Sequence, residues 1–159
     1  MALRLGSIAH LLRVVAPYPS DGSDEELLRT LEERQETFDI SALGEVYELY
    51  LGGWKCITDV SGLGGVHNLT LRGCHGITDV SALGSVQNLI LSLCDGITDV
   101  SALGGGHNLS LDDCDWITDV SALEGVYNLS LNGCHGITDV SALGGVHTVI
   151  AMGSRTCRP

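Results

Sequence analysis

Apolar residues recur along this chain with a period of twenty residues. Six windows of twenty residues align without gaps; they begin at Thr37, Ile57, Ile77, Ile97, Ile117 and Ile137, and the sixth ends at Thr156. Strict self-similarity at such a period is typical of a solenoid, in which every repeat forms one coil stacked on the next. The sequence therefore predicts a repeat solenoid over residues 37–156.

The spacing of apolar positions within one window predicts the structure of a coil. In the window from Ile117 the spacing is three residues everywhere except between Leu129 and Leu131, where it is two. A spacing of two puts both side chains on the same face of a strand. A spacing of three fits extended or 3₁₀ backbone. Each coil should therefore contain one short parallel β-strand, here around 128–131, and an extended or 3₁₀ return through 117–123.

The residues before the repeats predict helices that cover the first coil. Ser23 and Glu26 form a capping box, and Leu27, Leu28 and Leu31 make an apolar stripe behind it. We assign residues 1–36 to an N-terminal helical cap region and 157–159 to a tail. The first twenty residues are apolar with two arginines, so a targeting peptide is the alternative for them.

Aspartate recurs at one position of the repeat and cysteine recurs at another in the four middle windows, and both residue types bind metals in other proteins. Cys74, Cys94, Cys114 and Cys134 are twenty residues apart, so stacking places them in a straight column. Parallel side chains in a row cannot converge tetrahedrally on one zinc ion, so we interpret them as small buried hydrophobes with a weak thiol donor. The sequence predicts no metal and no cofactor.

Two further columns have structural interpretations. Aspartate should accept hydrogen bonds from the amides that open each 3₁₀ turn, and asparagine, just before each strand, should satisfy backbone groups. The columns are Asp59, Asp79, Asp99, Asp119 and Asp139, and Asn68, Asn88, Asn108 and Asn128. His75 and His135 stand three coils apart, and no catalytic constellation remains. We predict that the chain is not an enzyme.

Charge and hydropathy narrow the choice of partners. The formal net charge is −12, which argues against binding to nucleic acid or to anionic membranes, because there is little to neutralise phosphates. No apolar run reaches the roughly 18 residues of a transmembrane helix. We therefore expect a cytoplasmic protein.

The segment from Val126 to Cys134 reads V-x-x-L-x-L-x-x-C, which resembles the leucine-rich repeat. The return segment "ITDVSAL" is similar to internalin-type repeats, and "C-x-x-ITD" is similar to the cysteine-containing repeats of F-box proteins. The resemblance covers residues 37–156 and implies a concave parallel sheet that binds a protein. The alternative it implies is an adaptor or substrate-recognition component of an F-box-like ubiquitin ligase pathway.

Departures between coils at outward positions are the best guide to a binding site, because stacking fixes the framework. Ile90 and Leu93 are apolar where their counterparts are small or polar, and Trp116 replaces a glycine. We predict a protein-binding patch for a basic segment, with an exposed aromatic anchor and an acidic rim. Its residues are Arg72, Ile90, Leu93, Asp112, Asp113, Asp115 and Trp116. The C-terminal coil has no evident polar cap, and we predict self-association through that edge.

Overall fold

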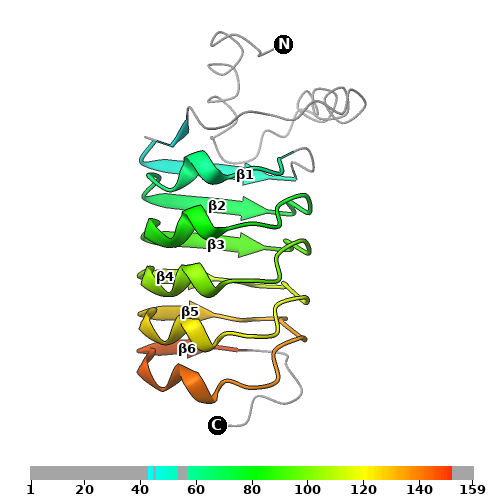
Figure 1. Cartoon of the computed structure of the whole chain (residues 1–159), viewed down its shortest axis with the longest axis vertical. Coiled ribbons are helices and arrows are strands. Elements are labelled where there is room, and N and C mark those ends of the chain that lie inside the picture. Colours follow the sequence, from blue (N-terminus) through cyan, green and yellow to red (C-terminus); the bar gives the residue numbers. More distant parts are fainter. Residues whose placement is uncertain (1–42, 45, 54–56, 152–159) are drawn as a thin grey trace, which may run out of the picture.

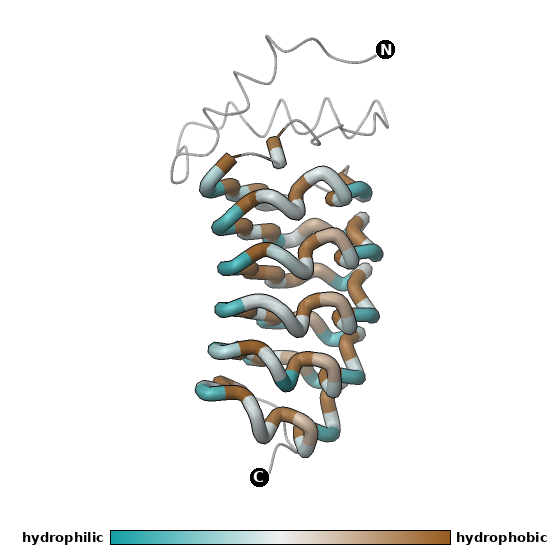
Figure 2. The backbone as a smooth tube through the Cα atoms, turned by 60° about the vertical axis from the view of Figure 1, so that its left-hand side comes forward, coloured by the Kyte–Doolittle hydropathy of each residue, from teal (hydrophilic) through white to brown (hydrophobic). Residues whose placement is uncertain are grey.

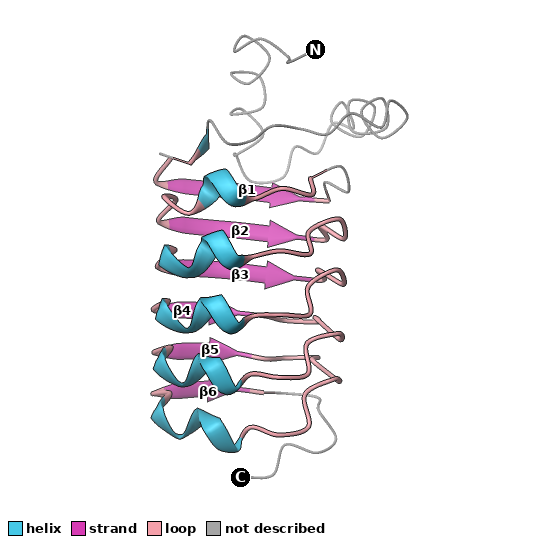
Figure 3. Ribbon diagram, viewed as in Figure 1, coloured by secondary structure: helices cyan, strands magenta, loops and turns pink. Residues whose placement is uncertain are grey.

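The computed structural model describes residues 43, 44, 46–53 and 57–151, and these residues form a stack of similar coils (Figure 1). Each coil has one strand on one side and one 3₁₀ turn on the other, so the predicted solenoid is confirmed (Figure 3). The described residues contain no α-helix. The predicted helical cap over residues 1–36 lies outside the described residues.

The strands form a single parallel sheet in the order β1-β2-β3-β4-β5-β6. They are β1 (Glu48–Gly52), β2 (Asn68–Arg72), β3 (Asn88–Ser92), β4 (Asn108–Ser110), β5 (Asn128–Ser130) and β6 (Thr148–Ile150). Every strand pairs with a twenty-residue offset, as in Leu69↔Leu89. This register puts identical positions of successive repeats side by side, which is why single residues become columns.

The return path of each coil is a short 3₁₀ turn. These turns are η3 (Ser61–Leu63), η4 (Ser81–Ser85), η5 (Ser101–Gly105), η6 (Ser121–Gly125) and η7 (Ser141–Gly145). Each buries one leucine, such as Leu103 in η5. The spacing of three in the sequence is the signature of this turn, since a 3₁₀ helix brings every third residue to the same side.

The core is a column of aliphatic side chains between the sheet and the 3₁₀ turns. Hydrophobic residues recur along the backbone of successive coils (Figure 2). Leu109 and Leu111 point inward from the strand segment, and Ile117, Val120 and Leu123 point inward from the next return. Among the described residues no polar or charged side chain is buried. Because each coil covers its neighbours, burial depends on stacking and not on any coil alone.

One core position is unfilled in the fourth coil. Val86, Val126 and Val146 end their 3₁₀ turns in extended backbone, and Gly106 has the same role with φ −71°. A Cβ at Gly106 would lie 3.4 Å from Val86 O and 3.6 Å from Leu103 O, which is ordinary contact. The backbone and the space therefore both accept valine.

We predict that Gly106→Val stabilises the protein by about 1 kcal/mol, because it buries two methyl groups and reduces the freedom of the unfolded chain. Urea unfolding followed by circular dichroism measures the change. A lower midpoint for the variant would mean that glycine is needed here for another reason.

Candidate functional site

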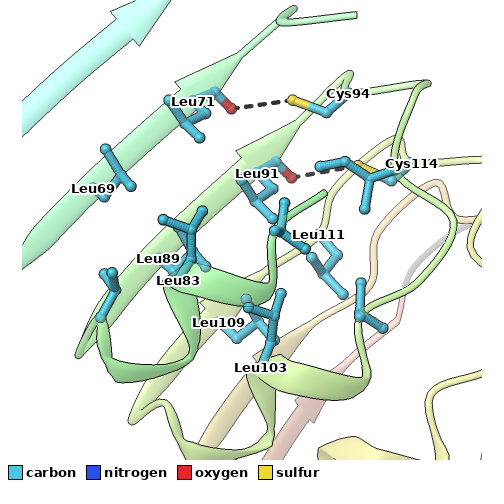
Figure 4. Close-up of a cluster of buried hydrophobic side chains, with 14 of the residues drawn as sticks. Leu69, Leu71, Leu83, Leu89, Leu91, Cys94, Leu103, Leu109, Leu111 and Cys114 are labelled. Atoms are coloured by element: carbon cyan, nitrogen blue, oxygen red, sulfur yellow. Dashed lines mark hydrogen bonds between the residues drawn. The ribbon is translucent and has the colours of Figure 1, made fainter. Parts of the chain in front are cut away.

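The cysteine column is part of the core. Cys94 Sγ donates a hydrogen bond to Leu71 O at 3.5 Å, and Cys114 Sγ donates to Leu91 O at the same distance (Figure 4). Burial raises the pKa of the Cys114 thiol to about 12, and it also raises the pKa of Cys94 and Cys134. The thiols therefore stay protonated at neutral pH and act as donors between coils. This confirms the interpretation of this column as structural.

The aspartate column caps the 3₁₀ turns, as predicted. In each of five coils an aspartate Oδ1 accepts a hydrogen bond from the backbone N–H of the serine two residues later, at 2.8–2.9 Å. For Asp79, Asp99, Asp119 and Asp139, this amide lowers the pKa below the ordinary value of 3.8, and the serine hydroxyl lowers it further. In the described coils these carboxylates accept local capping hydrogen bonds, and they are not arranged as ligands of a metal ion.

These lowered pKa values predict a specific acid sensitivity. A carboxyl whose pKa is lower in the folded state stabilises the fold above its unfolded pKa, and that contribution disappears as the pH falls through the folded pKa. We expect the melting temperature to fall as the pH drops from about 5 to below 3.8, and to fall less steeply when all four aspartates are replaced by asparagine. Asparagine keeps a capping oxygen but does not titrate in this range.

Differential scanning calorimetry across this pH range measures the two slopes. The matched control is Asp95→Asn with Asp115→Asn, which removes carboxylates from outside the column. The fourfold variant should have a shallower slope than this control. Equal slopes for the wild type and the fourfold variant would contradict the prediction.

The asparagine column is a ladder of side-chain amides. Asn88 Nδ2 donates to Asn68 Oδ1 at 2.6 Å, Asn108 Nδ2 donates to Asn88 Oδ1, and Asn128 Nδ2 donates to Asn108 Oδ1 at 2.6 Å. The sequence predicted that these amides satisfy the backbone, whereas the observed bonds join amide to amide. Each asparagine thus links its coil to the next at the N-terminal ends of the strands.

A column of stacked rings stands directly before the asparagine ladder. The ring centroids of Tyr47 and His67 are 4.7 Å apart, those of His107 and Tyr127 are 4.7 Å apart, and those of Tyr127 and His147 are 4.5 Å apart. In the sequence, His67, His107 and His147 share this position with Tyr47, Gln87 and Tyr127, which indicates that imidazole is not required there. The stacking follows from the strand spacing of about 4.8 Å, which brings planar side chains of successive coils into contact.

The outward side of the sheet, which we call the strand face, carries a shallow hollow of about 350 Å³. Its lining includes Ile90, Ser110, Ser130, Thr148 and Ile150 together with three residues of the asparagine ladder, Asn88, Asn108 and Asn128. The side chains of Ile90 and Ile150 are 42 % and 45 % exposed. Small polar residues between two larger apolar ones leave room for a side chain from another molecule.

The structure divides the predicted patch between two surfaces. Arg72 and Ile90 lie on β2 and β3 and face outward from the sheet. Asp112 reaches the same face, where it contacts two serines that line the hollow. Leu93, Asp113, Asp115 and Trp116 lie instead in the turns that follow the strands. We call that side of the solenoid the turn edge.

Asp112 has a structural role that the sequence did not reveal. Its Oδ1 accepts hydrogen bonds from Ser130 Oγ at 2.6 Å and Asn132 N at 3.0 Å, and its Oδ2 accepts one from Ser110 Oγ at 2.8 Å. Asn132 Nδ2 donates in turn to Ser130 Oγ at 3.0 Å. The carboxylate therefore ties the fourth coil to the fifth.

No group of three or more histidine, cysteine, aspartate or glutamate side chains in the described part of the chain is arranged to hold a metal ion. Within the same residues, no helix has the length and hydrophobicity needed to cross a membrane. The chemistry that the described surfaces offer is hydrogen bonding, apolar contact and charge, which is mainly negative.

One parallel strand and one 3₁₀ turn per twenty residues, with an asparagine ladder, define a leucine-rich-repeat solenoid. An internalin, InlF of Listeria monocytogenes, has a similar structure, with a TM-score of 0.58 and 26 % identity over 81 % of this chain. The functional domain of InlJ from the same organism, which includes a cysteine ladder, matches over 77 % of this chain with a TM-score of 0.42 and 20 % identity.

The chain spans 42 % of the InlF chain and 33 % of the InlJ chain, less than half of either. No protein-family model matches the sequence, and no curated protein matches it. The predicted resemblance to leucine-rich repeats is confirmed by the fold, because the strands, the 3₁₀ turns and the similarity to InlF all agree with it.

Proposed function

We propose that this chain is a protein-interaction module that binds a protein partner on the strand face and has no catalytic activity. The observation that carries the proposal is the hollow on that face, between Ile90 and Ile150. Similarity to an internalin solenoid supports a repeat module for protein interaction in general. A rigid sheet supports recognition because ordering it costs nothing further on binding.

The lining of the hollow indicates what it would receive. Ile90 and Ile150 supply apolar walls, and the serine hydroxyls and asparagine amides supply hydrogen-bonding groups between them. An apolar side chain of the partner would fill the centre and its backbone would contact the polar groups. Burying Ile90 would provide a small anchor of the kind that dominates many interfaces.

The charge of this chain indicates the charge of its partner. Asp112 borders the hollow through Ser110 and Ser130, and the net charge of the chain is −12. A basic protein segment is the complementary partner, because opposite potentials accelerate encounter and set orientation. We place the module in the cytoplasm, and the buried, reduced thiols of Cys94, Cys114 and Cys134 support that placement, since reduced cysteines are usual there.

The test begins with affinity capture from a lysate of the organism that makes the protein, followed by mass spectrometry and titration of the captured partner. Ile90→Ser removes the apolar wall and installs the residue found at Ser110 and Ser130, so the coil should fold normally. The matched control is Ala122→Ser, an exposed residue on the opposite, 3₁₀ side.

We expect Ile90→Ser to weaken binding about tenfold and Ala122→Ser to leave it unchanged. Equal affinities for both variants would remove the strand face from consideration. Recovery of ubiquitin-ligase subunits as the main captured proteins would favour the adaptor alternative.

A further inference from the structure

The turn edge is a second exposed surface, separate from the strand face. It consists of the turns that follow the strands, which stack on one side of the solenoid (Figures 1 and 3). Backbone hydrogen bonds join successive turns, as between Leu93 N and Asp112 O at 3.1 Å and between Asp113 N and Asn132 O at 2.7 Å. Residues at equal positions in the third and fourth coils are therefore neighbours.

Leu93 occupies a position where the backbone favours glycine. Gly53, Gly73 and Gly133 have φ between 65° and 74° at this position, and Leu93 has φ 55°. A leucine in this left-handed region is strained because its Cβ approaches the following carbonyl. Its side chain is also 38 % exposed, so burial in the core does not fully compensate for the strain.

Trp116, in the next coil, occupies a position where the neighbouring coil leaves little room for a side chain. A Cβ added at Gly96 would lie 2.4 Å from Ile77 O, and one added at Gly136 would lie 2.3 Å from Asp115 O. Trp116 occupies the equivalent position in the coil between them, yet its side chain is 63 % exposed. This large residue therefore opposes close stacking and contributes little to the core.

The surroundings of these two residues are acidic. Asp95, Asp113 and Asp115 are exposed in the same two turns, and the sequence contains no lysine or arginine between Gly73 and Ser154. Within the described part, Asp95 contacts His75 Nδ1 at 3.2 Å, and Asp115 accepts a bond from His135 N at 3.2 Å. Negative charge thus borders two exposed apolar side chains.

We propose that Leu93 and Trp116 form the apolar centre of a second docking surface on the turn edge, for a basic protein segment that carries apolar side chains. The acids orient the segment, and the indole and leucine side chains bury its apolar residues. Strained residues persist most readily at functional positions. The proposal does not depend on binding at the strand face.

The probe is a random dodecapeptide phage library selected on the full chain, and the enriched peptides are then titrated by fluorescence anisotropy. The variants are Leu93→Gly and Trp116→Gly, which restore the glycine found at those positions in other coils. Ala122→Ser, on the opposite 3₁₀ side, is the matched control, and Ile90→Ser reports separately on the strand face. Thermal unfolding is measured on the same samples.

We expect enrichment of peptides that combine lysine or arginine with apolar residues, and a loss of affinity of about tenfold or more in each glycine variant. Leu93→Gly should at the same time raise the melting temperature by about 2–8 °C, and Trp116→Gly should not lower it. Loss of binding with a gain in stability separates a functional residue from a structural one.

Three results would overturn the proposal. They are the absence of any enriched peptide, enrichment of peptides without basic residues, and affinity that survives both glycine variants. Peptides that lose affinity only in Ile90→Ser would assign binding to the strand face alone. Loss of affinity in the glycine variants with full binding by Ile90→Ser would assign the selected peptides to the turn edge.

Discussion

Gly104→Ala should destabilise the protein by about 2–3 kcal/mol, although it adds a single methyl group to a 3₁₀ turn. A Cβ at Gly104 would lie 2.2 Å from Ala122 O, a backbone atom of the next coil. Neither coil can move away easily, because each is packed against a neighbour on its other side. Urea unfolding measures the loss, and an unchanged midpoint would contradict this steric account.

Gly144→Ala is the matched control. Gly144 has the same position in η7, but a Cβ there would meet nothing within 4 Å. We expect a change within about 0.5 kcal/mol, or a small gain because alanine restricts the unfolded chain. Equal losses in the two variants would show that glycine is needed for its backbone and not for close stacking.

The chain itself contains one natural exception. Glu124 replaces glycine at this position in η6, and the turn that follows, η7, departs from helical geometry at Leu143 with φ −82° and ψ 15°. A side chain at this position is thus compatible with the fold where the next turn is the last one described. Gly104 lies farther inside the stack, where the same adjustment would disturb coils on both sides.

Asp112→Ala should cost about 2–3 kcal/mol, because it removes the acceptor of three hydrogen bonds, two of which join the fourth coil to the fifth. Ser110, Ser130 and the amide of Asn132 would all lose this partner, and the half-buried hydroxyls would have to find water. Thermal and urea unfolding measure the change. The variant tests the structural role of Asp112 separately from any role in binding.

Asp115→Ala provides the comparison, since it makes the same chemical change three residues later in the chain. Asp115 is exposed and accepts a single described bond, from His135 N at 3.2 Å. Asp115→Ala should lower the free energy of unfolding by about 0.5 kcal/mol or less. If Asp115→Ala were as destabilising as Asp112→Ala, the hydrogen-bond network would not be the cause.

This difference affects the interpretation of binding experiments. A charge reversal at Asp112 would change both the surface potential and the tie between coils, so reduced binding could not be attributed to charge alone. Asp112→Asn keeps a side-chain oxygen for the serine hydroxyls, and it is the better variant for testing attraction of a basic partner. Its melting temperature should lie between those of the wild type and Asp112→Ala.

The sequence by itself determined the fold and the structural columns. A strict period of twenty residues requires equal coils, and the single spacing of two between Leu129 and Leu131 locates the strand. The register then follows, so the buried position of Cys94 and the capping role of Asp79 could be predicted before any coordinates. Repetition makes this possible because each position has the same neighbours in every coil.

Only the tertiary structure decided what lies between coils. Planar residues of different types, such as His107 and Tyr127, became a stack because the sheet spacing holds their rings in contact. Asp112 became a tie between coils because Ser130 and Asn132 stand one coil away, in reach of its carboxylate. The division of the predicted patch into a strand face and a turn edge has the same origin. Side-chain direction and distance across coils depend on stacking, and a linear pattern does not contain them.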